Sequence, residues 1–161
     1  MSYIFVVTRQ YEKAIVEAEQ AIALDPNGAD SLVALGYALS IAGRPEEAIV
    51  LIKKAIRSNP IAPGHYFGNL GRAYRMTGKY DEAIAAYKKS LERSANNILT
   101  HVGLTATYSL SDRDDEARAQ AKEVLRVQPK FSVNLYVKKL PFKDKSETQR
   151  LIDALTKAGL K

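Results

Sequence analysis

Two arginines, Arg72 and Arg75, stand three residues apart in a segment with helical periodicity. Side chains at this spacing project from nearly the same face of a helix. His65 and Asn69 precede them at similar intervals. Guanidinium groups bind carboxylates through charge-assisted hydrogen bonds. These four residues therefore predict a site for a carboxylate or an acidic side chain. The alternative is that both arginines are solvated surface charges.

The other reactive residue types do not form a catalytic or metal-binding pattern. The chain has no cysteine, which excludes disulfides and thiolate chemistry. Its two histidines, His65 and His101, have no acidic or histidine partner at the spacing of metal ligands. The sequence has no glycine-rich phosphate loop and no nucleophile–base arrangement. We therefore expect no enzyme activity, no metal and no cofactor.

The basic residues of this chain gather at its C-terminal end. The formal net charge is +6, and the tail, residues 130–161, holds eight basic and three acidic residues. One interpretation is a solvated capping segment, and the other is a docking surface for an acidic partner, nucleic acid or an anionic membrane. The tail aromatics Phe131, Tyr136 and Phe142 are better explained by packing than by base stacking, so we expect no nucleic acid.

The sequence predicts a cytoplasmic protein. No segment approaches the roughly 18 apolar residues needed to span a membrane. The apolar run from Tyr3 to Val7 is too short for a secretion signal and has no basic residue before it. The absence of cysteine is compatible with a reducing compartment.

A sequence repeat runs through the chain and determines where the candidate binding residues lie. Motifs of the type Tyr-Asp-Glu-Ala-Ile recur along the chain, and their alanines are 34, 35 and 34 residues apart. A period close to 34 with helical texture is typical of paired helices that stack in an array. The recurring alanines are Ala14, Ala48, Ala83 and Ala117.

The repeat predicts helical hairpins. Small residues such as Gly36 and Gly71 should face the alanine anchors and let the two helices of a hairpin approach closely. Gly43 and Gly78 should supply the positive φ of the turn between them. After a helix at 11–24, we expect helix pairs at 29–41 and 45–58, at 64–77 and 80–93, and at 98–110 and 114–127. The extra residue of the 35-residue spacing should fall in a longer loop at 59–65.

The two ends of the array differ from its middle. About ten residues precede the first complete helix, and Ile4, Phe5 and Val6 would leave an apolar flank that favours a dimer contact or a missing upstream neighbour. In the tail, Asp144 and Glu147 predict a capping box. The apolar stripe of the helix that follows should pack on the last hairpin and cover the open end of the stack.

Residues 11–129 resemble the tetratricopeptide-repeat (TPR) family, because several motif positions agree across four copies. The resemblance implies an all-α, right-handed superhelical stack of antiparallel helical hairpins with a concave peptide-binding groove and a C-terminal capping helix. The division is then a partial first repeat at 1–26, repeats at 27–60, 61–97 and 98–129, and a basic capping segment at 130–161.

The resemblance also implies which residues face the groove. The first helix of each hairpin would line it. An apolar floor with several polar groups favours an acidic–apolar peptide or an amphipathic helix as guest. The implied groove positions are Asp30, Val33, Tyr37, Ile41, His65, Asn69, Arg72, Arg75, Met76, Val102 and Leu110.

The tail has a second resemblance. Its segments around Gln128-Pro129-Lys130-Phe131, Leu140-Pro141-Phe142 and 151–160 are similar to the ends of repeat arrays fused to bacterial class III adenylate cyclases. The main expectation is a cytoplasmic scaffold that binds a protein or peptide. The alternatives are a regulatory or oligomerising C-terminal region of such a bacterial signalling enzyme, and a homo-oligomer formed through the N-terminal hairpin.

Overall fold

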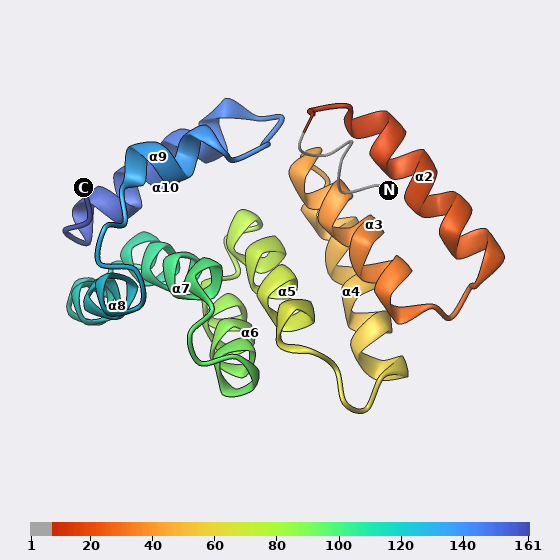
Figure 1. The fold of residues 1–161 in the computed structure, drawn as a ribbon, viewed down its shortest axis with the longest axis horizontal. Helices are drawn as coiled ribbons and strands as arrows, with labels where there is room; N and C mark the ends of the chain where they lie inside the picture. The colour runs from red at the N-terminus through yellow and green to blue at the C-terminus, as the bar shows by residue number, and fades with distance from the viewer. Residues whose placement is uncertain (1–7) are drawn as a thin grey trace.

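The computed structural model describes residues 8–161 as a stack of antiparallel helix pairs (Figure 1). All regular secondary structure in this range is helical, which confirms the predicted fold class. The apolar flank expected at Ile4, Phe5 and Val6 lies outside the described residues. The helices are α2 (Tyr11–Leu24), α3 (Ala29–Ile41), α4 (Pro45–Ser58), α5 (Gly64–Met76), α6 (Tyr80–Arg93), α7 (Ile98–Leu110), α8 (Asp114–Val127), α9 (Val133–Lys138) and α10 (Lys145–Lys157).

The helix boundaries coincide with the predicted ones, apart from α5, which ends one residue early at Met76. The pairs α3–α4, α5–α6 and α7–α8 each form a hairpin, and α2 packs against α3. The extra residue of the longer repeat lies in the loop at 59–63, as predicted. Adjacent hairpins are joined by shorter loops at 25–28 and 94–97.

Each hairpin turn depends on one residue with positive φ. Gly43 and Gly78 have φ values of +88° and +75°. Asp112 takes the same place in the last hairpin with φ 56°, a region that aspartate visits more readily than most residues. In each turn the next residue donates a backbone hydrogen bond to a carbonyl five residues earlier, as in the bond from Arg44 N to Leu39 O at 2.8 Å.

The core of the stack is built on small residues. The anchors Ala14, Ala48, Ala83 and Ala117 are all buried. Gly36 was expected to face Ala48, but the nearest side chain is that of Ile52, and Ala48 contributes its carbonyl oxygen. The reason is that Ile52 lies one turn beyond Ala48 on the same face of α4.

Tyr87 of α6 lies between two glycines. A Cβ added to Gly71 of α5 would stand 2.8 Å from the Tyr87 ring, and one added to Gly103 of α7 would stand 2.6 Å from it. Both helices therefore pack their backbones against this one buried ring. The spacing of α5, α6 and α7 is set by this contact.

The tail packs on the last hairpin and also reaches back across the stack. Leu151, Leu155, Ala158 and Leu160 are buried, and α10 contacts α7, which confirms the predicted stripe. Between α9 and α10 the chain crosses to α3, where Lys143 N donates to Ile41 O at 3.0 Å. This contact was not predicted. Figure 1 shows the turn between α9 and α10 approaching the first hairpins.

The predicted capping box is half formed. The Asp144 carboxylate accepts a hydrogen bond from Ser146 N at 2.8 Å, and this bond lowers the pKa of Asp144. The side chain of Glu147 was expected to turn back to the cap, but it pairs with Arg150 and Arg75. Its carboxylate is therefore used for tertiary structure.

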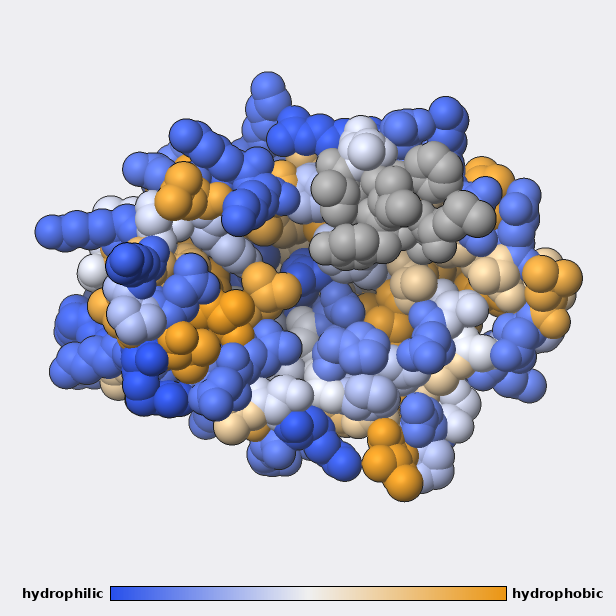
Figure 2. All heavy atoms as spheres, viewed as in Figure 1, coloured by the Kyte–Doolittle hydropathy of each residue, from blue (hydrophilic) through white to orange (hydrophobic). Residues whose placement is uncertain are grey.

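The helices of the described range are too short or too polar to cross a bilayer. Figure 2 shows that hydrophilic residues cover much of one face, with separate apolar areas between them. Exposed apolar side chains include Leu24, Ile61 and Leu135.

The Tyr87 contact gives a stability prediction. In Gly71→Ala the new methyl group would overpack the ring, and this cost should outweigh the gain in helix propensity, for a net loss of about 1–2 kcal/mol. Gly68→Ala is the matched control in the same helix, because its Cβ would meet only the hydroxyls of Ser90 and Thr100 at 3.3 and 3.4 Å. Urea unfolding measures the free energy of unfolding of both variants. Equal stability of the two variants would contradict this account of the core.

Candidate functional site

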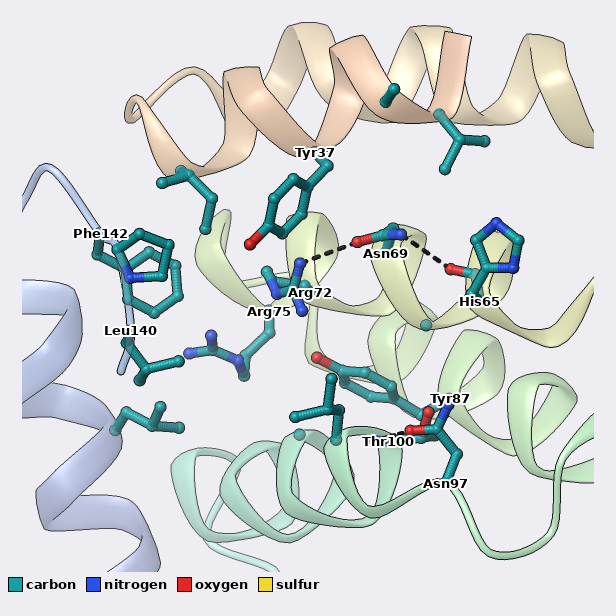
Figure 3. A pocket seen from close by; sticks show the side chains of 18 of the residues that line it. Tyr37, His65, Asn69, Arg72, Arg75, Tyr87, Asn97, Thr100, Leu140 and Phe142 are labelled. Atoms are coloured by element: carbon teal, nitrogen blue, oxygen red, sulfur yellow. Dashed lines mark hydrogen bonds between the residues drawn. The ribbon is translucent and has the colours of Figure 1, made fainter. Parts of the chain in front are cut away.

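The concave side of the stack contains a pocket of about 400 Å³. Helices α3, α5 and α7 form its walls, and the tail closes one side (Figure 3). The lining residues are Asp30, Val33, Ala34, Tyr37, Ile41, His65, Gly68, Asn69, Arg72, Arg75, Tyr87, Asn97, Leu99, Thr100, Gly103, Tyr136, Leu140, Pro141, Phe142 and Leu151.

Helical spacing brings these side chains to one surface. Val33, Tyr37 and Ile41 follow each other at intervals of four on α3, so they form one stripe. His65, Asn69 and Arg72 form a matching stripe on α5. The first stripe is mainly apolar and the second is polar. The pocket therefore has walls of different character.

Arg72 is held in a fixed position. Its Nη1 donates to the Asn69 side-chain oxygen at 2.8 Å, and Asn69 Nδ2 donates to the His65 carbonyl at 3.0 Å. The guanidinium carbon lies 5.1 Å from the centre of the Tyr37 ring, a cation–π contact. Figure 3 shows this chain of contacts running along α5. The pocket wall thus carries a half-buried positive charge in a fixed position.

Arg75 has a different environment from Arg72. It is 3% exposed, so the interpretation as a solvated surface charge is wrong for this residue. Its Nη1 lies 3.7 Å from Glu147 Oε2. Arg75 Nε, Arg75 Nη1 and Glu147 Oε2 are buried without a hydrogen-bond partner within the described range. The tail thus covers this arginine with a carboxylate that pairs with it only loosely.

Asp30 stands at the rim of the pocket and is held by Tyr66. The Tyr66 hydroxyl donates to Asp30 Oδ1 at 2.6 Å. Burial, together with this bond to a carboxylate, raises the pKa of Tyr66 to about 12. Burial likewise raises the pKa of Tyr136, which the tail contributes to the pocket. Both phenols therefore stay neutral at physiological pH.

The structure brings most of the predicted groove residues together. Asp30, Val33, Tyr37, Ile41, His65, Asn69, Arg72 and Arg75 all line the pocket. Their binding role stays a prediction.

Three predicted groove residues lie elsewhere. Met76 lines a second hollow of about 160 Å³ beside Phe142 and Glu147. Val102 is fully buried, and Leu110 packs half-buried against the core. The reason is that α7 packs against α8 on one side and α10 on another, so its side chains from Thr100 to Ser109 are buried.

Several lining residues were not predicted. Tyr87 and Thr100 come from the repeat itself, and the second-helix position of Tyr87 gave no sign that its ring reaches the concave side. The tail contributes Leu140, Pro141 and Phe142. Three apolar residues in a row inside a basic segment were the available signal that this loop packs against something.

The arrangement is suited to binding. It combines an apolar wall, one fixed arginine and one covered arginine.

The histidine and acidic side chains do not form a metal site. Buried His101 is hydrogen-bonded through its Nε2 to the carbonyl of Ala95 at 2.8 Å, and its other ring nitrogen is hydrogen-bonded to Gln120. Among residues 8–161, no three histidine or acidic side chains lie close enough together to hold a metal ion.

Comparison with known protein families identifies repeats in two parts of the sequence. Two family models, both described as tetratricopeptide repeat, match residues 17–50 and 65–130, and together they cover more than half of the chain. The chain is 32% identical over 99 residues to small glutamine-rich tetratricopeptide repeat-containing protein 2 of Mycosarcoma maydis, a match that covers 62% of the chain and 28% of that protein.

A second relative is longer still. The chain is 28% identical over 138 residues to cellulose synthase operon protein C of Pseudomonas fluorescens, which covers 81% of the chain and 11% of that protein. The chain therefore spans less than a third of the length of either relative.

Solved structures share the fold. MamA superposes with a TM-score of 0.71 at 20% identity, covering 98% of this chain and 92% of that one. YrrB, described as a TPR protein with an unusual peptide-binding site, superposes with a TM-score of 0.65 at 18% identity, covering 98% and 80%. At these identities the likeness concerns the fold alone.

The Tyr66–Asp30 bond predicts a pH effect. A raised pKa in the folded state means that the stabilisation is complete below the unfolded pKa of about 10 and is lost as the pH rises toward about 12. Tyr66→Phe removes this hydrogen bond and should lower the free energy of unfolding by about 1 kcal/mol at neutral pH. The loss stays small because the exposed Asp30 carboxylate is hydrated by water in the variant. Its stability should then fall less steeply than that of the wild type above about pH 10. Urea unfolding of both proteins between neutral pH and about pH 12 tests this prediction. If the stabilities of the wild type and the variant fell in parallel with pH, the stabilising role of the bond would be contradicted.

Proposed function

Because the chain belongs to the tetratricopeptide-repeat family, we propose that it is a non-enzymatic scaffold that holds an acidic and apolar segment of a partner protein in its concave pocket. The observation that carries this proposal is the position of Arg72. Its guanidinium is fixed by Asn69 and Tyr37 and stands opposite an apolar wall. A cation held in place loses little side-chain freedom when a carboxylate binds it.

With the tail in place, the size of the pocket limits the guest. A volume of about 400 Å³ lies in the range of sites for small ligands. A whole helix with side chains is about 10–12 Å across and would not enter. The guest is therefore a few side chains of an extended segment or of one helix face, with a carboxylate directed at Arg72 and an apolar group directed at Val33 and Ile41.

The solved structure of YrrB supports the idea at the level of the fold. YrrB is described as a TPR protein with an unusual peptide-binding site. Backbone-rigid helix pairs can receive a peptide with little rearrangement. For this chain, peptide binding, a cytoplasmic location and an acidic partner are parts of the proposal.

Two alternatives remain hypotheses. A role as the C-terminal region of a bacterial signalling enzyme, such as a class III adenylate cyclase, rests on the sequence of the tail alone. Self-association through the N-terminal hairpin rests partly on residues outside the described range. Light scattering of the purified chain tests the second alternative.

Charge reversal at Arg72 tests the proposal. The probe is a short labelled peptide of alternating glutamate and leucine, compared with one in which glutamine replaces glutamate. Arg72→Glu should weaken binding of the acidic probe at least about tenfold, because an attraction becomes a repulsion. Arg75 is unsuitable for this test, since its reversal would disrupt a buried ion pair.

Arg57→Glu is the matched control. It makes the same charge change on the exposed side of α4, away from the pocket lining. Fluorescence anisotropy should show no loss for this variant. An Arg72→Glu protein that binds the acidic probe as tightly as the wild type would overturn the assignment of the pocket, and so would equal losses in both variants.

A further inference from the structure

The segment at 140–147, here called the crossing segment, borders the pocket with its first three residues and the second hollow with Phe142, Asp144 and Glu147. Pro141 and Phe142 are buried, and both line the pocket together with Leu140. The next residue, Lys143, donates its backbone N–H to Ile41 O at 3.0 Å, at the end of α3. A non-helical piece of this chain, residues 140–144, thus already lies against the concave face, where a peptide guest would lie.

The crossing segment ends in a carboxylate that meets an arginine. Glu147 is 8% exposed, and its Oε2 lies 3.7 Å from Arg75 Nη1. Figure 3 shows Arg75 extending from α5 toward Leu140 of the tail. Apolar groups followed by an acidic group make the same chemical pattern that we propose for the guest.

This contact is incomplete. Arg75 Nε, Arg75 Nη1 and Glu147 Oε2 are buried and lack hydrogen-bond partners in the described part of the chain. A buried ion pair repays its desolvation only when further hydrogen bonds satisfy both groups. The ion pair between Lys143 and Glu12 is exposed and contributes little. The other carboxylate oxygen of Glu147 pairs with Arg150 of its own helix at 2.5 Å. The crossing segment is held by the burial of Pro141 and Phe142, and its contacts cost no association entropy because they are intramolecular.

The charges around the crossing segment favour its release by an acidic partner. Lys138, Lys139, Lys143 and Lys145 are all exposed on or beside it. A partner rich in carboxylates would attract these lysines and compete with Glu147 at the same time. The basic excess of the tail then has a role that simple capping does not explain.

We propose that the crossing segment is an internal ligand of the pocket, and that an acidic partner binds by replacing Glu147 at Arg75. The proposal rests on the proposed function and names how the same site is regulated. The first turn of α10 unwinds to release Glu147, while Leu151 and Leu155 keep the rest of the helix packed. Arg75 then becomes the second cation for the guest, beside Arg72.

The test uses the full chain and the glutamate–leucine probe. Glu147→Gln removes the internal carboxylate and should raise the affinity for the probe at least about tenfold. Asp153→Asn is the matched control, because it makes the same charge change at an exposed position of the same helix. This control should bind the probe as the wild type does.

A second variant leaves the Arg75–Glu147 pair intact, in case Glu147→Gln impairs folding. Lys143→Pro removes the backbone donor to Ile41 O and should also raise the affinity. Lys143→Ala keeps that donor, loses only the exposed side-chain pair and should change little. Hydrogen exchange of the wild type provides a further measurement: adding the probe should speed exchange at 140–147 while it slows exchange in α5.

The outcomes separate the two proposals. If binding of the probe depends on Arg72 but is unchanged by Glu147→Gln and Lys143→Pro, the internal-ligand proposal is overturned and the proposed function stands. Slower exchange at 140–147 in the presence of bound probe would also overturn the internal ligand and leave the proposed function intact. If neither the wild type nor the two released variants bind the probe, the proposed function fails, and the internal ligand fails with it.

Discussion

The close contact between a large side chain and the backbone of its neighbours determines the shape of this molecule. Tyr87 lies between Gly71 and Gly103, so three consecutive helices share one ring as their spacer. Ile52 plays the same part against Gly36. Because the first helices α3, α5 and α7 are held at these short distances, their inner faces combine into one continuous wall. The pocket is a consequence of this packing, and Tyr87 itself forms part of its floor.

The polar groups of the pocket are distributed unevenly on this wall. Arg72 has nearby partners on its own helix and on α3, which fix it without neutralising it. Arg75, one turn further, has no such partners and is instead covered by Glu147. Two arginines that are equivalent by spacing thus have different environments, because the tail places a carboxylate against only Arg75.

Sequence patterns predicted the repeat part of the structure well and the tail only in part. Helix boundaries followed from the 34-residue period and from turn residues such as Gly43 and Gly78, since these constraints act locally. Asp144 and the apolar stripe of α10 were also local signals. Val102 and Leu110 were placed wrongly on the pocket, because α7 packs against both α8 and the distant α10. The contact between Lys143 and Ile41 has no local signal at all, since it joins residues far apart in the chain.

That contact alters how the stack holds together as it unfolds. In an open array each repeat touches only its neighbours, so the end repeats can fray while the middle stays intact. Here the hydrogen bond from Lys143 to Ile41 connects the last helices to the first complete hairpin and closes the array into a loop. Separation of either the first complete hairpin or the last helices from the stack must then break this connection. The tail therefore gives a short solenoid some of the all-or-none cooperativity of a globular domain, and an event that lifts the tail would return the repeats to melting one by one.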